Sequence, residues 1–178
     1  GKGRYSIRSY TKMKVALTAS EIKTLLELDT FESVEERKSR DLWVMQFYCN
    51  GVNLNDMVRL RWDHLVGNCF VIQRQKTKNT SSSRQVLIRI PLVENLKNLI
   101  EKRGNKNSPY VLGFLKDGMS ESQILEKKRR VASLMNAHLK TLGKRLNFAI
   151  ELLSETSRDA YASTLKRNGR SIEEIAEM

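Results

Sequence analysis

The stretch from residue 74 to residue 84 combines basic side chains with hydroxyl and amide groups. Its basic members are Arg74, Lys76, Lys78 and Arg84, and the residues between them are Gln, Thr, Asn and Ser. Such side chains donate hydrogen bonds to the oxygens of a phosphate group. The stretch therefore predicts a phosphate-binding loop. A turn that is simply kept solvated by its charge explains the same residues equally well.

A second candidate for phosphate chemistry is Arg158, which lies between Ser157 and Asp159 in the first turn of an expected helix. The helix dipole favours anions rather than cations at that end, so the position of this arginine needs an explanation. An anion held at the helix N-terminus would provide one. A salt bridge from Arg158 to Asp159 or Glu155 is the alternative explanation.

Other common catalytic sites have no counterpart in the sequence. It contains no glycine-rich phosphate loop, no GxSxG elbow and no HExxH motif. The only histidines are far apart: His64 is expected to cap a helix end, and His138 to lie at the surface or its boundary. The two cysteines, Cys49 and Cys69, form no CxxC pair. We therefore expect no metal site and no disulfide framework.

The overall charge points to the class of partner. The 178 residues include 32 Lys and Arg against 20 Asp and Glu, which gives a formal charge of +12. Such an excess favours nucleic acid or another anionic surface, although a basic domain without a polyanionic partner has the same composition. The length fits one domain with its own core. With no apolar run long enough for a membrane span and no signal peptide, the expected location is cytoplasmic.

The hydrophobic periodicity predicts a mostly helical domain interrupted by one small antiparallel sheet. A capping box of Thr18 and Glu21 opens the first helix, a second begins near Ser33, and a short third follows Asn53. The β-rich runs 68–73 and 84–90 predict a hairpin, with residues 74–83 at its tip. Further helices are expected over 92–103, 121–142 and 156–166, and from the capping box of Ser171 and Glu174.

Two segments extend the basic surface beyond the hairpin tip. Residues 1–16 read as a basic arm or linker, which leaves 17–178 as the folded domain. The long helix over 121–142 carries a basic run, and Leu134, Met135, Leu139 and Leu142 are expected on its apolar side. The run consists of Lys127, Lys128, Arg129 and Arg130.

The order of these segments resembles the catalytic domain of the tyrosine recombinases, or phage-type integrases, and above all those of mobile elements and conjugative transposons. Five segments carry the resemblance over nearly the whole chain: 47–62 (FYCNGVNLNDMVRLRW), 74–92 with its Lys-Thr pair and Ile-Pro-Leu end, 135–140, 153–164 and 168–178. It implies a DNA breaking-rejoining fold and site-specific DNA recombination or integration through a 3′-phosphotyrosyl intermediate, without metal or cofactor. The implied partner is double-stranded DNA in a bacterial, nucleoid-associated setting.

The resemblance also assigns roles to single residues. Lys76 matches the hairpin lysine, a general acid that protonates the leaving 5′-oxygen, and Arg158 matches the arginine of the His-x-x-Arg motif, which clamps the scissile phosphate. Asn53 stands at the place of the family's first arginine, Glu155 at the histidine of His-x-x-Arg, and Asp159 at the histidine after the arginine. Replacing a cation by Asn53 removes charge that the transition state needs, and an ionised Glu155 repels the phosphate.

The resemblance makes Tyr161 a core aromatic residue, and it places the last family histidine and the tyrosine nucleophile beyond Met178. We therefore expect a truncated catalytic domain that does not cleave DNA alone, monomeric here and tetrameric on DNA in the full-length protein. Its expected DNA contacts are Arg74, Lys78, Arg84, Lys127, Lys128, Arg129 and Arg130. Two alternatives remain: a DNA-binding relative without activity, and a basic helical adaptor for an acidic protein or RNA.

Overall fold

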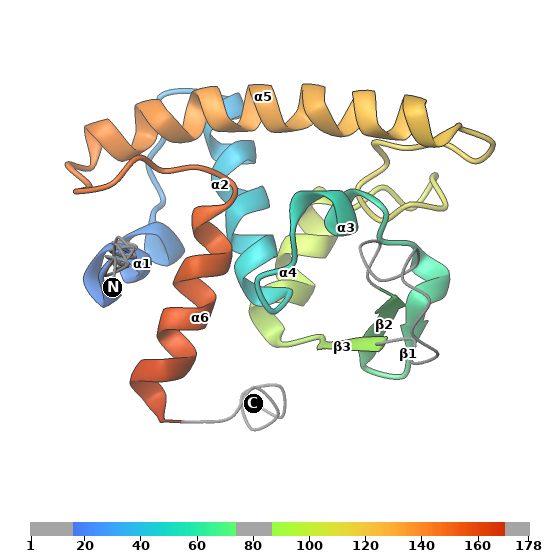
Figure 1. Cartoon of the computed structure of the whole chain (residues 1–178), viewed down its shortest axis with the longest axis horizontal. Helices are drawn as coiled ribbons and strands as arrows, with labels where there is room; N and C mark the ends of the chain where they lie inside the picture. Colours follow the sequence, from blue (N-terminus) through green and yellow to red (C-terminus); the bar gives the residue numbers. More distant parts are fainter. Residues whose placement is uncertain (1–15, 74–86, 170–178) are drawn as a thin grey trace, which may run out of the picture.

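The computed structural model describes residues 16–73 and 87–169, and these form helices around one small sheet (Figure 1). The elements in chain order are α1 (Ala19–Glu27), α2 (Val34–Tyr48), α3 (Leu54–Val58), the 3-10 turn η1 (Trp62–His64), β1 (Leu65–Val66), β2 (Cys69–Gln73), β3 (Leu87–Pro91), α4 (Glu94–Arg103), α5 (Glu121–Arg145) and α6 (Thr156–Asn168). The predicted fold class, mainly helical with a small antiparallel sheet, is confirmed. The helix expected from Ser171 and nearly all of the basic arm lie outside the described residues.

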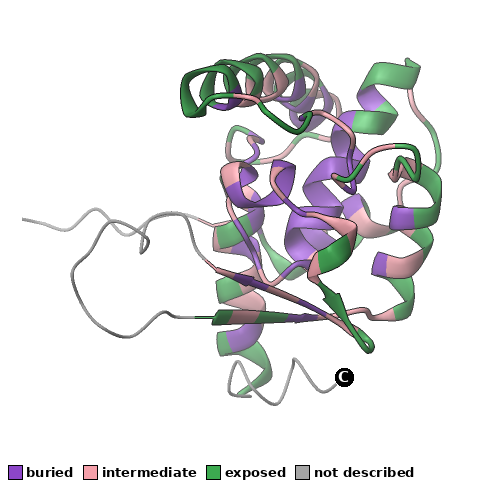
Figure 2. Ribbon diagram, turned by 90° about the vertical axis from the view of Figure 1, so that its right-hand side faces the viewer, coloured by how far each residue is buried: buried purple, intermediate pink, exposed green. Residues whose placement is uncertain are grey.

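Helix α2 is the centre of the domain, because α1, α4, α5 and α6 all pack against it. Its residues from Ser39 to Phe47 are all buried. The indole of Trp43 is wholly buried and stacks on the ring of Phe47, with the ring centroids 6.0 Å apart. Figure 2 shows the buried residues gathered in the interior, while the outer side of α5 is exposed. Burial on every side explains why α2 lacks a single apolar face.

The helix starts follow the capping residues that the sequence predicts. The hydroxyl of Thr18 accepts from the backbone N–H of Glu21 at 3.1 Å, and the carboxylate of Glu21 accepts from the backbone N–H of Thr18 at 2.8 Å. The hydroxyl of Ser33 caps α2 by accepting from the N–H of Glu36 at 3.0 Å. Each cap satisfies backbone N–H groups that have no partner within their helix. Because capping depends on neighbours only three residues away, the sequence was sufficient to place these starts.

The sheet has the antiparallel order β1-β2-β3. Phe70 of β2 pairs with Ile90 of β3, and both side chains are buried against the helices. Gln73 and Leu87 form the last described pair, so the expected hairpin pairing is confirmed up to that point. The strand β1 was not predicted, because two exposed residues carry no alternating pattern.

Helix α5 is three residues longer than the predicted span, which ended at 142, and it packs along α2 and α3. Met135, Leu139 and Leu142 are buried as predicted. The prediction for Leu134 is wrong, since 56% of this residue is exposed. One residue corresponds to a rotation of about 100° around the helix axis, so the neighbour of Met135 points away from the buried face. Among the described helices, none combines the length and apolar character needed to cross a membrane.

Candidate nucleic-acid interface

The hairpin residues with the strongest sequence signal lie in a segment that the structure does not describe. Lys76, with Arg74, Lys78 and Arg84, falls within residues 74–86. The candidate general acid and three of the predicted DNA contacts therefore stay predictions. The structure does fix the ends of the strands that lead to this segment, at Gln73 and Leu87.

The start of α6, which carries Arg158, is held firmly against the core. The indole N–H of Trp43 donates to the hydroxyl oxygen of Thr156 at 3.0 Å, and that hydroxyl donates to the carbonyl of Leu153 at 2.6 Å. From the side of α5, the side-chain oxygen of Asn136 accepts from the N–H of Ser154 at 2.9 Å. Three elements far apart in the sequence thus meet at the first turn of α6.

Arg158 projects from this fixed turn into solvent. It is exposed, and among the described residues no ion pair joins its guanidinium to Glu155 or Asp159. The salt-bridge explanation for this arginine is therefore not realised within the described part of the chain. An exposed guanidinium on a rigid helix start presents a fork of N–H donors that matches a phosphate group.

The backbone at this helix start offers less to an anion than the sequence suggested. The N–H groups of Thr156, Ser157 and Arg158 donate to the carbonyls of Leu153, Ser154 and Glu155 at 3.1, 3.3 and 3.1 Å. They are occupied because a helical turn precedes α6, with Glu155 at φ −65° and ψ −28°. The expectation of an anion held by free N–H groups of the helix N-terminus is therefore corrected: an anion here would bind the side chain of Arg158.

The turn after α2 touches α6 directly at Arg158. Gly51 has a φ of +65°, and a Cβ atom built on it would lie 3.2 Å from the Cα of Arg158 and 3.1 Å from the Cβ of Tyr161. Any other residue would therefore meet both a strained backbone and a steric contact. The close approach places Gly51 directly against the first turns of α6.

Asn50 connects this turn to its neighbours. Its side-chain oxygen accepts from the hydroxyl of Tyr161 at 3.1 Å, and its amide donates to the carbonyl of Arg89 in β3 at 3.1 Å. The phenol of Tyr161 is partly buried and meets the ring of Phe47 edge to face, and burial raises its pKa. The role expected for Tyr161, that of a packed aromatic residue, agrees with these contacts.

Asn53, expected at the place of a phosphate-binding arginine, acts as the N-cap of α3. Its oxygen accepts from the N–H of Asp56 and its amide donates to the carboxylate of Asp56, both at 2.8 Å. Both polar groups of the side chain are thus engaged with a buried acidic residue. Asn53 therefore supplies local structure at the start of α3 but no cation.

The two remaining positions that the resemblance assigns are acidic residues on either side of Arg158 in the sequence. Glu155 is exposed in the turn just before the helix, and Asp159 is partly buried one residue after the arginine. Neither residue can provide the positive charge that a histidine gives when it is protonated. Within the described residues, Arg158 is therefore the one cation among the four positions that the resemblance assigns there.

A cavity of about 400 Å³ lies beside the root of the hairpin, and no motif in the sequence predicts it. Its lining includes Gln73 and Leu87 together with Asp56, Arg59 and Arg61. Arg59 makes two hydrogen bonds to the carboxylate of Glu121, at 3.0 and 2.8 Å. These partners lie 62 positions apart, a separation that no local pattern reveals.

Arg61, on the same cavity, is held by acidic residues as well. It donates to Asp117 at 2.8 Å and to Asp63 at 3.2 Å, and its guanidinium lies over the ring of Tyr110. Hydrogen bonds to Asp117 and Asp63 raise the pKa of Arg61 above its ordinary value. His64, expected to cap a helix as a cation, accepts instead through Nδ1 from the N–H of Arg61 at 3.2 Å. Both arginines thus hold this edge of the domain together.

The basic run on α5 is accessible. Lys127, Arg129 and Arg130 are exposed and Lys128 is partly buried. Arg130 forms an ion pair with Glu126 at 2.5 Å, one helical turn away. The run ends six residues before Asn136, which corresponds to about 9 Å along the helix axis from the contact between α5 and the start of α6. The expected DNA contacts of this run are therefore sterically available.

Comparison with known proteins identifies a solved structure with a similar fold. No family model matches the sequence, and no curated protein matches it. Among solved structures, the XerA recombinase, a tyrosine recombinase, superposes with a TM-score of 0.55 at 14% sequence identity. The superposition covers 96% of this chain and 56% of the XerA chain. The fold is that of a tyrosine recombinase.

The match to a tyrosine recombinase fold covers the region around Arg158, but it assigns no activity to this chain. The chain spans about half the length of XerA, and the match extends over nearly all of this chain. The likeness in fold therefore includes the region where the turn 50–53 meets α6. At this level of identity the likeness concerns the fold alone.

Proposed function

We propose that this chain is the DNA-binding catalytic domain, or most of it, of a protein that recombines or integrates DNA at specific sites. The observation that carries the proposal is the exposed guanidinium of Arg158 on a rigid helix start, packed against the turn at Gly51. A phosphodiester group of double-stranded DNA is the anion that such a fork fits in this fold. The charge of +12 supports a polyanionic partner.

The proposed reaction is a transesterification. A tyrosine hydroxyl gives its proton to water and attacks a DNA phosphorus, so that a bond from phosphorus to the tyrosine oxygen forms and the bond from phosphorus to the 5′-oxygen breaks. Arg158 donates hydrogen bonds to the non-bridging oxygens, whose negative charge grows in the transition state. Lys76 gives its proton to the leaving 5′-oxygen. We place the tyrosine outside residues 1–178, and we assign the active assembly on DNA as a tetramer.

A DNA-binding relative without cleavage activity is the second candidate, and a specific observation favours it. The side chain of Asn53 is hydrogen-bonded to Asp56, and Glu155 adds a carboxylate near Arg158. A site with one arginine and a nearby carboxylate stabilises a doubly charged phosphorane less well than a site with two arginines. Both candidates share DNA binding through Arg158, and they differ only in covalent chemistry.

A nicked suicide substrate separates the two candidates. The complete protein is incubated with a duplex in which cleavage releases a short strand, so that the covalent intermediate accumulates. The recombinase proposal expects a protein–DNA adduct at a tyrosine, which is lost in Arg158→Ala while DNA binding is weakened. If the complete protein binds the duplex but forms no adduct, its function is DNA binding without cleavage.

A further inference from the structure

Asn50 occupies a sharp turn between α2 and α3 that the backbone itself fixes. Its φ is +60°, a left-handed conformation that asparagine adopts more readily than most residues, and Gly51 follows with a φ of +65°. The N–H of Gly51 donates to the carbonyl of Gln46 at 2.9 Å, and the amide of Gln46 donates to the carbonyl of Val52 at 3.1 Å. The turn therefore fixes the direction in which the side chain of Asn50 leaves the backbone.

Both polar groups of the Asn50 side chain bind elements that are distant in the sequence. The amide donates to the carbonyl of Arg89 in β3, and the oxygen accepts from the hydroxyl of Tyr161 in α6, both at 3.1 Å. Because a carbonyl accepts but does not donate, Arg89 selects the orientation in which the amide nitrogen faces β3. The oxygen of Asn50 then faces α6, where Tyr161 is the donor. One side chain thus joins α6 to the sheet.

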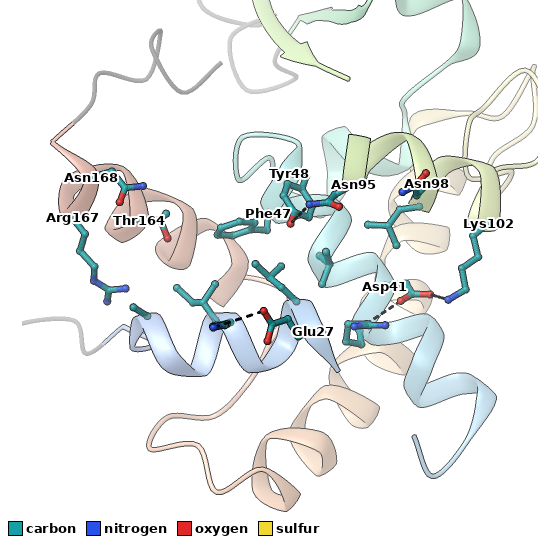
Figure 3. Close-up of a pocket in the computed structure, with 17 residues that line it drawn as sticks. Glu27, Asp41, Phe47, Tyr48, Asn95, Asn98, Lys102, Thr164, Arg167 and Asn168 are labelled. Atoms are coloured by element: carbon teal, nitrogen blue, oxygen red, sulfur yellow. Dashed lines mark hydrogen bonds and ion pairs between the residues drawn. The ribbon is translucent and has the colours of Figure 1, made fainter. Parts of the chain in front are cut away.

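Close packing does not fix this side of α6. A cavity of about 350 Å³ lies here, lined by Tyr161 and Thr164 of α6 on one side and by Pro91 of β3 on the other. In Figure 3, which shows the adjoining cavity of about 730 Å³, Phe47 lies between Thr164 of α6 and Asn95 of α4. Atoms that line a cavity lack contacts on that side, so the hydrogen bonds of Asn50 supply what packing does not.

The connection reaches α6 one turn after Arg158. Tyr161 follows Arg158 by three residues, so the two occupy neighbouring positions on one face of the helix. A Cβ atom on Gly51 would lie 3.2 Å from the Cα of Arg158 and 3.1 Å from the Cβ of Tyr161. The ring of Tyr161 also meets the ring of Phe47, with the centroids 6.0 Å apart. A shift of α6 at Tyr161 would therefore move Arg158 as well.

From this geometry we propose that Asn50 is a positioning residue for Arg158. Its side chain fixes the first turns of α6 relative to β3, and it thereby holds the guanidinium of Arg158 in the direction from which a DNA phosphate approaches. The functional half of this inference rests on the proposed function. The structural half, the connection of α6 to the sheet through Asn50, does not require DNA, so the two halves are tested separately.

Amide hydrogen exchange of the full chain tests the structural half. Asn50→Gly keeps the left-handed turn, which glycine adopts freely, and removes both side-chain hydrogen bonds. Asn147→Gly is the matched control, because Asn147 is an exposed residue with a φ of +56° after the end of α5. We expect faster exchange over residues 158–164 of α6 in Asn50→Gly but not in Asn147→Gly. Equal exchange over these residues in the two variants would overturn the connection.

Duplex DNA binding over a range of salt concentrations tests the functional half. We expect Asn50→Gly to weaken binding by a factor of about 3 to 30 and to lower the slope of log K against log salt toward that of Arg158→Ala. Adding Asn50→Gly to Arg158→Ala should weaken binding no further, because both changes remove the same phosphate contact. A loss of folded protein would reduce the amount of DNA bound but leave the slope unchanged, so the slope separates positioning from stability.

Tyr161→Phe is a second variant that leaves the turn untouched. It removes only the hydroxyl that binds Asn50 and keeps the ring against Phe47. We expect the same direction of change as in Asn50→Gly, and no further change when the two are combined. Unchanged slopes in both variants, beside a lower slope in Arg158→Ala, would overturn the positioning of Arg158. An unchanged slope in Arg158→Ala would overturn the proposed function together with the functional half, and hydrogen exchange would still decide the connection.

Discussion

Gly51 determines how closely the turn after α2 approaches Arg158. Its positive φ and the two contacts that a Cβ would make, at 3.1 and 3.2 Å, act together. We expect Gly51→Ala to lower the free energy of unfolding by about 2 kcal/mol, because it adds backbone strain and displaces α6. Urea denaturation measures the change.

Gly67 provides the matched control for this substitution. Its φ is +60°, but a Cβ there would meet nothing within 4 Å. Gly67→Ala therefore carries the backbone cost alone and should destabilise less than Gly51→Ala. Equal losses in the two variants would show that the contact with α6 contributes nothing.

The two cysteines should differ strongly in reactivity. Cys49 is wholly buried at the end of α2, and burial raises the pKa of its thiol to about 12, whereas Cys69 is only partly buried. Because the thiolate is the reactive form, we expect iodoacetamide at pH 8 to modify Cys69 well before Cys49. Mass spectrometry of the native protein follows both sites, and comparable rates would contradict the buried position of Cys49.

The same shift gives a pH dependence of stability. The pKa of the Cys49 thiol is higher in the folded protein than in the unfolded chain, so the unfolded chain loses this proton first as the pH rises. The favourable contribution of the buried thiol is therefore complete below pH 9 and declines between about pH 9 and pH 12. Cys49→Ala removes this contribution, and unfolding curves of both proteins over that range measure it.

At the scale of elements, Asp41 ties α2 to α4. It is wholly buried, and it accepts from Arg40 beside it and from Arg103 at the end of α4. Asp41→Asn would leave these cations without their anion, so we expect a loss of about 3 to 5 kcal/mol in the free energy of unfolding. Asp117→Asn is the control, because the Asp117 side chain is exposed in its ion pair with Arg61. Losing this pair should lower the free energy of unfolding by less than about 1 kcal/mol.

The elements that the sequence predicted are those with local signals. Thr18, Ser33 and Asn53 mark helix starts through contacts three residues away, and the β-rich runs fix the pairing of β2 with β3. The strand β1 is too short for such a signal. Leu134 was placed on the wrong side of α5 because a run of apolar residues does not reveal which of two neighbours faces the core.

The candidate site was predictable only in part, for a related reason. Arg158 was found from its unusual place in a helix start, a local signal. Contacts between distant segments, such as the approach of Gly51 to α6 and the pair of Arg59 with Glu121, have no trace in one sequence. Asn53 is the clearest example of what one sequence does not predict, since only the structure shows that its side chain is hydrogen-bonded to Asp56.

For the molecule as a whole, the proposed function predicts DNA binding through phosphate contacts that include Arg158. A charge of +12 alone would also fit an adaptor for RNA or an acidic protein. The proposed function and the exposed guanidinium of Arg158 favour duplex DNA. The number of phosphates contacted, read from the salt dependence of binding, distinguishes a defined interface from general attraction.

The most direct test is duplex DNA affinity measured over a range of salt concentrations for the chain, for Arg158→Ala and for Lys38→Ala. Lys38 is a surface cation on α2 paired with Glu35, outside the proposed interface. We expect log K to fall with log salt by about 0.9 per phosphate contact, and the slope to decrease by about one in Arg158→Ala but not in Lys38→Ala. A flat slope for the chain, or an unchanged slope in Arg158→Ala, would contradict the assignment of Arg158 to DNA.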